Sequence, residues 1–186
     1  MKRILFLIAC TLMFSFQVLS QETSKGITRV LRANFLNPGI EYEVPFFKKS
    51  TVAFNIGAGY GGSYPHLTTN ASGWLYMIST FLDVEYRNYY NYQKRITKQK
   101  NVDYNSSNFW GVRVLTRGEA FSSNFTRTTD YDFAVGPIWG IQRSFGKMNL
   151  LFDLGAVYYF DTKGNGGFLP ILELNVGYNF DIKQRN

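Results

Sequence analysis

Cysteine and histidine are almost absent from this sequence of 186 residues. The single cysteine, Cys10, lies among the first twenty residues, so the remaining chain has no disulfide and no thiolate to act as a nucleophile or to bind a metal. The single histidine is His66. Sites built from clusters of Cys and His are therefore excluded, and we expect no cofactor and no bound metal.

Long hydrophobic runs are also scarce. One apolar run, residues 4–16, follows Lys2 and Arg3, and no second run of about 18 residues exists to form a transmembrane helix. This pattern predicts that residues 1–20 are a signal peptide cleaved after Ser20, which leaves residues 21–186 as one domain.

An alternative for the leader is a lipoprotein signal. Leu7-Ile8-Ala9-Cys10 resembles the site at which a lipoprotein cysteine is acylated. The apolar run before Cys10 is short and continues past it, which favours the ordinary signal peptide.

The formal net charge of +7 raises the question of an anionic partner. Removal of Lys2 and Arg3 leaves 18 basic and 13 acidic residues, a net charge of +5. Such a balance suits nucleic acid or anionic lipid. In an exported chain we expect the basic group at residues 94–100 to meet lipid head groups, and we expect no nucleic acid partner.

Alternation of apolar and polar residues with a period of two runs through most of the chain and indicates an all-β fold. The clearest segments are 51–61, 131–143, 149–160 and 168–182, and the alternation is noisier in 80–91 and 108–117. Residues 27–47 contain Asn37-Pro38-Gly39, so they form two short strands joined by a tight turn or one kinked strand. Counting two predicts an eight-stranded antiparallel up-and-down β-barrel.

That count predicts which connections lie at which end. Inner turns are expected at residues 47–50, 91–107 and 146–148, and outer loops at 37–39, 62–77, 118–129 and 161–167.

The polar face favours a transmembrane barrel over a soluble one. All nine lysines after residue 20 fall in turns, loops or terminal segments, whereas the exterior of a soluble barrel carries many. The polar face instead carries small residues and charges of both signs, which a narrow interior holds only in pairs. The predicted interior network is Arg32, Glu41, Glu43, Asp83, Glu85, Arg87, Arg113, Asp132, Asp153 and Glu173.

Aromatic residues near the strand ends predict the girdles of a membrane barrel. They are Tyr86, Tyr89, Tyr90, Tyr92, Tyr158, Tyr159, Phe160, Phe168, Tyr178 and Phe180. The last strand also carries Gly177, Phe180 and Ile182 in the spacing that barrel-assembly machinery recognises in final strands. We therefore expect a bacterial outer-membrane location.

Two segments carry a family resemblance. The run from Asn34 to Glu43 (NFLNPGIEYE), followed by Gly57-x-Gly59-Tyr60, resembles the opening of small outer-membrane β-barrel families of Bacteroidota-type bacteria. Residues 85–91 followed by 94–95 are similar to the mid-barrel strand and basic inner turn of those families. The resemblance spans most of residues 27–182 and implies a location and a fold, with no catalytic residues.

The expected function is a structural, accessory or binding role exerted through the outer loops, without catalysis. Expected partners are outer-membrane lipids, lipopolysaccharide, the barrel-assembly machinery and an unidentified protein. Three alternatives stay open: a narrow pore for small solutes, a lipid A-modifying enzyme and a soluble lipocalin-like carrier. An enzyme would need His66 as a base, but the His-x-Ser spacing of such enzymes is absent, because Leu67 and Thr68 follow His66.

Overall fold

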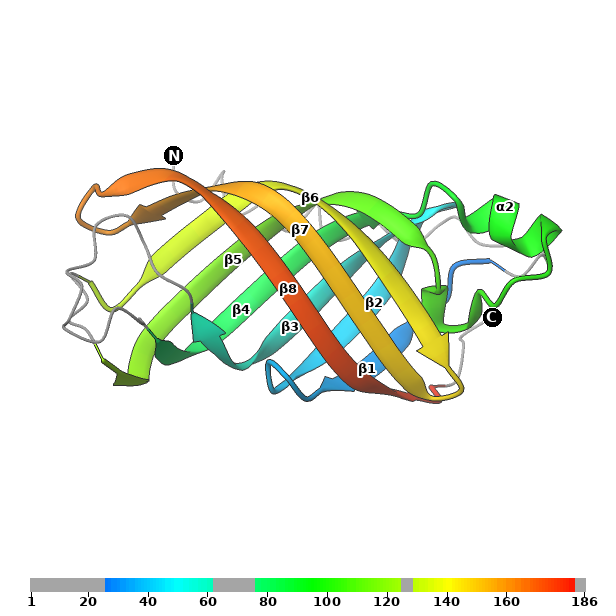
Figure 1. Cartoon of the computed structure of the whole chain (residues 1–186), viewed down its shortest axis with the longest axis horizontal. Helices are drawn as coiled ribbons and strands as arrows, with labels where there is room; N and C mark the ends of the chain where they lie inside the picture. Colours follow the sequence, from blue (N-terminus) through cyan, green and yellow to red (C-terminus); the bar gives the residue numbers. More distant parts are fainter. Residues whose placement is uncertain (1–25, 62–75, 125–128, 183–186) are drawn as a thin grey trace, which may run out of the picture.

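Eight antiparallel strands form a closed ring in the computed structural model, which describes residues 26–61, 76–124 and 129–182. The strands are β1 (Val30–Asn34), β2 (Gly39–Phe47), β3 (Ser50–Gly61), β4 (Met77–Asn88), β5 (Asn108–Ser123), β6 (Asp132–Phe145), β7 (Met148–Asp161) and β8 (Gly166–Phe180). Each strand pairs with the next along the chain, and β8 pairs with β1 to close the ring (Figure 1). The predicted leader, with Cys10, and His66 lie outside the described residues.

The predicted strand count and up-and-down order are confirmed. Residues 27–47 form two strands, β1 and β2, joined by a turn at residues 35–38. The other six strands cover the segments with period-two alternation. Expected boundaries shift most in β5, which continues to Ser123 through the first half of the loop expected at 118–129, because it stays paired with the start of β4.

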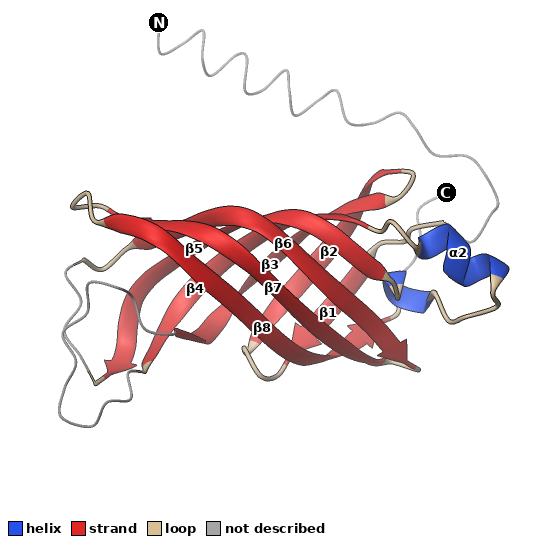
Figure 2. Ribbon diagram, turned by 45° about the horizontal axis from the view of Figure 1, so that its top comes forward, coloured by secondary structure: helices blue, strands red, loops and turns tan. Residues whose placement is uncertain are grey.

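The connection at residues 91–107 is not a plain turn. It contains a short helix, α2 (Tyr92–Thr97), and a 3-10 turn, η1 (Asp103–Asn105), and both lie at one end of the ring (Figure 2), here called the α2 end. A helix of six residues is too short to show a helical period in the sequence. Its place is set by tertiary contacts, among them the bond from the Tyr92 hydroxyl to the Gly26 carbonyl (2.9 Å). No helix in the described part of the chain is long and apolar enough to cross a membrane.

The interior of the ring has three layers, which follow one another along the inward face of β4. Tyr89, just beyond this strand, lies in an apolar cluster at the α2 end, and Phe81 lies in a second apolar cluster toward the other end. Between them the inward side chains are Asp83, Glu85 and Arg87, all buried. Charged side chains therefore occupy the middle of the ring, between two apolar layers.

The predicted girdle position is wrong for three of the aromatic residues. Tyr89, Tyr92 and Tyr159 are buried instead of lying on the outer surface. Near strand ends, two adjacent aromatic residues point to opposite faces, so composition alone assigns both to the girdle although only one reaches it.

Candidate functional site

The candidate site is a network of buried ion pairs, hereafter the ion-pair network, in the middle layer of the ring. Period-two alternation points its members inward from six strands. They are Arg32 on β1, Glu41 and Glu43 on β2, Asp83, Glu85 and Arg87 on β4, Arg113 on β5, Asp153 on β7 and Glu173 on β8. No side chain among them is more than 12% exposed.

Arg32 and Arg87 organise the half of the ion-pair network nearer the α2 end. Both pair with Glu41: Arg32 through Nη1, and Arg87 with 3.0 Å between its Nη1 and Oε1 of Glu41. The Nε of Arg87 also lies 2.6 Å from Oε2 of Glu85. The Arg87 guanidinium sits 5.3 Å from the ring centre of Phe109, so it also makes a cation–π contact with the apolar layer beneath.

Arg113 organises the other half. Its guanidinium pairs with Glu85 and lies 3.0 Å from Asp83, 2.9 Å from Asp153 and 2.6 Å from Glu173. One side chain thus joins four strands across the interior, because a guanidinium presents five N–H donors in a planar fork.

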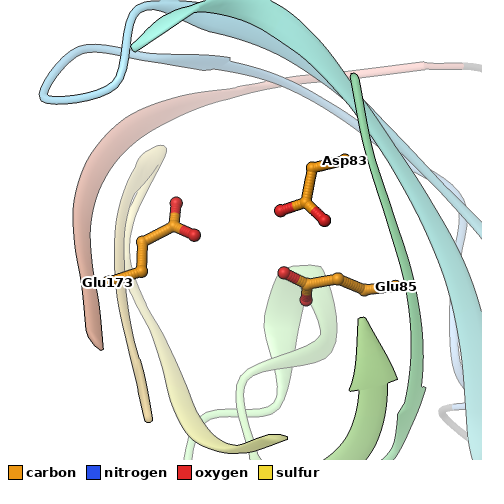
Figure 3. Close-up of side chains that lie close together, drawn as sticks. All are labelled: Asp83, Glu85 and Glu173. Carbon is orange, nitrogen blue, oxygen red and sulfur yellow. The ribbon is translucent and has the colours of Figure 1, made fainter. Parts of the chain in front are cut away.

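Three carboxylates around Arg113 converge on one space. Figure 3 shows Asp83, Glu85 and Glu173 turned toward one another, and one oxygen of each lies within 4.8 Å of the others. Oxygen atoms in this arrangement suit a hard cation such as Ca²⁺. Each of the three forms an ion pair with Arg113, so its guanidinium already supplies positive charge at this point.

The ion-pair network holds six carboxylates against three guanidinium groups. Hydrogen bonds from uncharged side chains stabilise part of the excess of carboxylates. Glu43 lies 3.5 Å or more from the arginine nitrogens but accepts the Tyr89 hydroxyl (2.5 Å) and Nδ2 of Asn105 (2.9 Å). Arg87 and Arg32 in turn donate to Gln142 (3.1 Å) and Asn179 (2.8 Å).

Sequence reasoning missed these neutral members. Gln142 and Asn179 fall on the polar face of their strands, and that alternation is the signal that could have found them. Asn105 comes from η1, outside any strand, and no periodicity marks it. The aromatic pattern places Tyr89 at the membrane boundary, whereas its hydroxyl lies inside the ring and donates to Glu43.

The remaining predicted residues lie elsewhere. Asp132 is buried at the start of β6, where it lies opposite Arg117 in the strand register. Arg113 lies opposite Gly136, four residues further along β6, so Asp132 sits closer to the end of the ring than Arg113 does. In the expected assembly signal, Gly177 packs closely on β1, where an added Cβ would lie 2.7 Å from the Ala33 carbonyl oxygen. Phe180 faces outward at the end of β8, and Ile182 follows the strand.

Outside the ring, aromatic and basic side chains meet near the α2 end. The Tyr90 hydroxyl accepts Nε1–H of Trp139 (3.1 Å) and Nδ2 of Asn108 (3.4 Å), and Oδ1 of Asn108 accepts from Arg143 (2.5 Å). Arg95 lies near enough for its charge to act on Arg143. The outer rim of this end is therefore aromatic and positively charged.

A second exposed contact lies at the end of β8. Asp181 accepts from Nζ of Lys147 (2.6 Å) and from the Tyr104 hydroxyl (2.6 Å). The two donors, Lys147 first, hold the pKa of Asp181 below its ordinary value. This contact ties the β6–β7 turn and η1 to the end of the last strand.

No protein-family model, curated protein sequence or solved structure matches this chain. The resemblance of residues 27–182 to small outer-membrane barrels is supported only as far as the closed ring of eight antiparallel strands.

Proposed function

We propose that the chain is an integral protein of a bacterial outer membrane: a transmembrane β-barrel with a filled interior that acts structurally or as an accessory subunit through its outer loops. The observation that carries this proposal is the outward face, where large apolar side chains are exposed on every strand from β2 to β8. They include Ile40, Phe54, Ile56, Leu82, Val112, Val114, Val135, Leu154, Leu172 and Leu174. A soluble monomer rarely exposes a contiguous apolar patch larger than about 600 Å².

Strand length supports the same proposal. The six strands from β3 to β8 contain 12–16 residues each. A tilted strand crosses the hydrocarbon layer with about 9–11 residues. Each of these strands is therefore long enough to span a bilayer and to extend beyond it.

Two outward aromatic rows support the proposed membrane boundaries. Near the α2 end, Tyr86 packs edge-on against Phe46 and Trp110, with ring centres 6.2 and 6.0 Å apart. Near the other end, Phe160 stacks on Phe133 at 5.2 Å. Aromatic rings are stable at the level of the lipid head groups, so the distance between the rows corresponds to the apolar layer.

The charged interior argues against a lipocalin-like carrier and against a wide pore. A soluble barrel that carries a lipid has its apolar face inward, the reverse of the arrangement around Arg113. An eight-stranded barrel has an interior just wide enough for side chains, and here ion pairs cross it. We therefore infer an interior closed to solutes.

The basic α2 end fits the periplasmic side, where the inner leaflet carries anionic phospholipid. Lys94, Lys98 and Lys100 are exposed there, and Arg95 and Arg143 lie beside the aromatic row. Basic side chains near a membrane surface gain about 1 kcal/mol each from anionic lipids. Replacing Arg95 and Arg143 with Gln should reduce co-purification of phosphatidylglycerol, and unchanged lipid content would contradict this contact.

Membrane fractionation tests the proposal as a whole. We expect the protein in the outer membrane, with a mobility on gels that differs between boiled and unboiled samples. Val114→Arg, in the middle of the outward face, should lower the free energy of unfolding in lipid vesicles, because an arginine facing mid-bilayer lipid costs about 2–4 kcal/mol. The matched control is Phe145→Arg, at an exposed strand end, where the cost near the interface is about 0–1 kcal/mol. Recovery in the soluble periplasm, or a Val114→Arg variant as stable as Phe145→Arg, would contradict the proposal.

A further inference from the structure

The β1–β2 hairpin is shorter than the strands on either side of it. β1 has 5 residues and β2 has 9, whereas β3 has 12 and β8 has 15. β2 pairs with β3 only as far as Gly57, and β1 pairs with β8 only from Gly177 onward. Figure 1 shows the turn of this hairpin, in blue, ending part-way along β8. The turn itself is hydrogen-bonded to Ala58, Tyr60 and Asn175. Beyond it, no strand of the described residues lies between the end of β3 and residues 166–174 of β8. We call this opening the lateral gap.

The edge of β8 in the lateral gap is chemically distinct. The Val176 carbonyl accepts from the Phe35 amide (2.8 Å), so it points toward β1. Alternate residues point the same way, so the backbone groups of Phe168, Pro170, Leu172 and Leu174 face the lateral gap. Proline lacks an N–H and occurs on edge strands, which makes this edge a poor template for another strand. The position of Pro170 thus argues against a protein strand as the occupant.

The lateral gap leads to a cavity of about 70 Å³ beside the ion-pair network. Its lining includes Tyr60 and Leu172, which are 63% and 69% exposed and belong to the apolar outward face. Asp83, Arg113 and Glu173 line its polar side. The opening therefore connects the apolar exterior to buried charges.

Asp83, which lines the cavity, has one side-chain oxygen without a hydrogen-bond donor among the described residues. Oδ2 of Asp83 pairs with Arg113, but its buried Oδ1 has no hydrogen-bond donor within the described residues. A buried acceptor without a donor destabilises the folded chain, because folding removes its hydrogen bonds to water and supplies none in exchange. A ligand that brings an N–H or O–H into the cavity would remove this cost.

We propose that the lateral gap is a binding site for a membrane lipid whose head group carries hydrogen-bond donors, such as an amine or hydroxyls. The head group lies in the cavity and donates to Asp83, while an acyl chain lies outside over Leu172 and Tyr60. This inference rests on the proposed membrane location. It goes beyond that proposal by naming a place and a ligand class.

Fluorescence quenching by brominated lipids tests the site. The parent for this test has all three tryptophans, Trp74, Trp110 and Trp139, replaced by Phe. Into it we introduce Phe81→Trp, which places the probe in the cavity, or the matched change Phe109→Trp, which places it inside the closed part of the ring. Leu115→Trp, also at the cavity, replaces Phe81→Trp if that variant does not fold. A version that retains Trp110, on the outward face, reports insertion in the bilayer.

The vesicles contain phosphatidylcholine and phosphatidylethanolamine, with one of the two brominated close to its glycerol backbone. Brominated phosphatidylethanolamine should quench the Phe81→Trp variant to an extent similar to Trp110, leave the Phe109→Trp variant unchanged, and act more strongly than brominated phosphatidylcholine, whose head group has no donor. Equal quenching by the two lipids would overturn the assigned contact with Asp83.

Two further outcomes separate this inference from the proposed function. Quenching of Trp110 without quenching of the Phe81→Trp variant would overturn the lipid site and leave the membrane location intact. The same holds if only water-soluble acrylamide quenches the Phe81→Trp variant, since the cavity would then hold water. Absence of Trp110 quenching would overturn the membrane location and, with it, the lipid site.

Discussion

Arg113 is the side chain whose loss should cost the barrel most. It is 1% exposed and pairs with Asp83, Glu85, Asp153 and Glu173, which approach it from three other strands. Methionine has a similar length and no charge, so Arg113→Met removes the guanidinium with little change in packing. Four buried carboxylates then lose their shared counter-ion.

The expected magnitude follows from the burial of these groups. Removing one partner of a buried ion pair destabilises a protein by about 3–5 kcal/mol, because the other charge stays buried without compensation. Glu85 keeps its ion pair with Arg87, but Asp83, Asp153 and Glu173 lose their guanidinium partner, so we expect the upper part of that range. The unfolding equilibrium should shift by about a thousand-fold, since each 1.4 kcal/mol is a factor of ten.

Urea unfolding in lipid vesicles, followed by fluorescence and by the gel shift between boiled and unboiled samples, measures this change. The control is Lys147→Met, which breaks the exposed pair with Asp181 and should leave the unfolding midpoint unchanged, because exposed pairs contribute little. Adding Asp153→Asn to Arg113→Met should restore part of the lost stability, since it removes one stranded charge.

A loss below about 1 kcal/mol for Arg113→Met, the size expected for exposed pairs, would refute the reasoning. So would a double variant less stable than Arg113→Met alone. Either result would mean that the carboxylates do not depend on this guanidinium in the folded barrel.

Three further results are expected. Gly57→Ala should destabilise the barrel by about 1–3 kcal/mol in urea unfolding, as overpacking does, because the added Cβ would lie 2.0 Å from the Pro38 carbonyl oxygen. The control is Gly167→Ala, which should cost much less because no atom lies within 4 Å of the added Cβ. Carbon-detected NMR of the Lys147→Met variant should show the pKa of Asp181 rising toward its ordinary value, and an unchanged pKa would contradict the assigned cause. Because the fold lowers this pKa, the contact stabilises the end of β8 at pH values above the ordinary pKa. That stabilisation is lost as the pH falls through the lowered pKa. Planar-bilayer conductance should stay at background, and resolved channel steps would contradict a closed interior.

Most of the strand architecture could be predicted from the sequence, because the alternation that defines a strand face is local. A side chain at position i and its neighbour at i+1 point to opposite faces whatever the rest of the chain does. That rule assigned Arg113, Asp153 and Glu173 to one polar face, and all three lie on the inner side of the ring. The turn residues Asn37-Pro38-Gly39 left one kinked strand or two strands open, and the structure has two, joined at residues 35–38.

The predictions failed where local alternation ends. Tyr89 and Tyr90 follow β4 directly, and only tertiary packing decides that Tyr89 donates to Glu43 inside while Tyr90 faces outward. The helix α2 is held by contacts with distant residues such as Gly26 rather than by its own periodicity. Asn105 enters the interior from η1, a segment with no repeat to reveal it.

The sequence by itself determined the strands, their two faces and the kinds of side chain on each, because these depend on residues a few positions apart. Only the tertiary structure decided which charges meet and where the wall opens. Arg113 reaches Asp153 and Glu173 because ring closure brings strands 40 and 60 residues away across one narrow interior. The lateral gap exists because a short hairpin is paired between two longer strands. Both features depend on strand register, which is set by contacts around the whole ring.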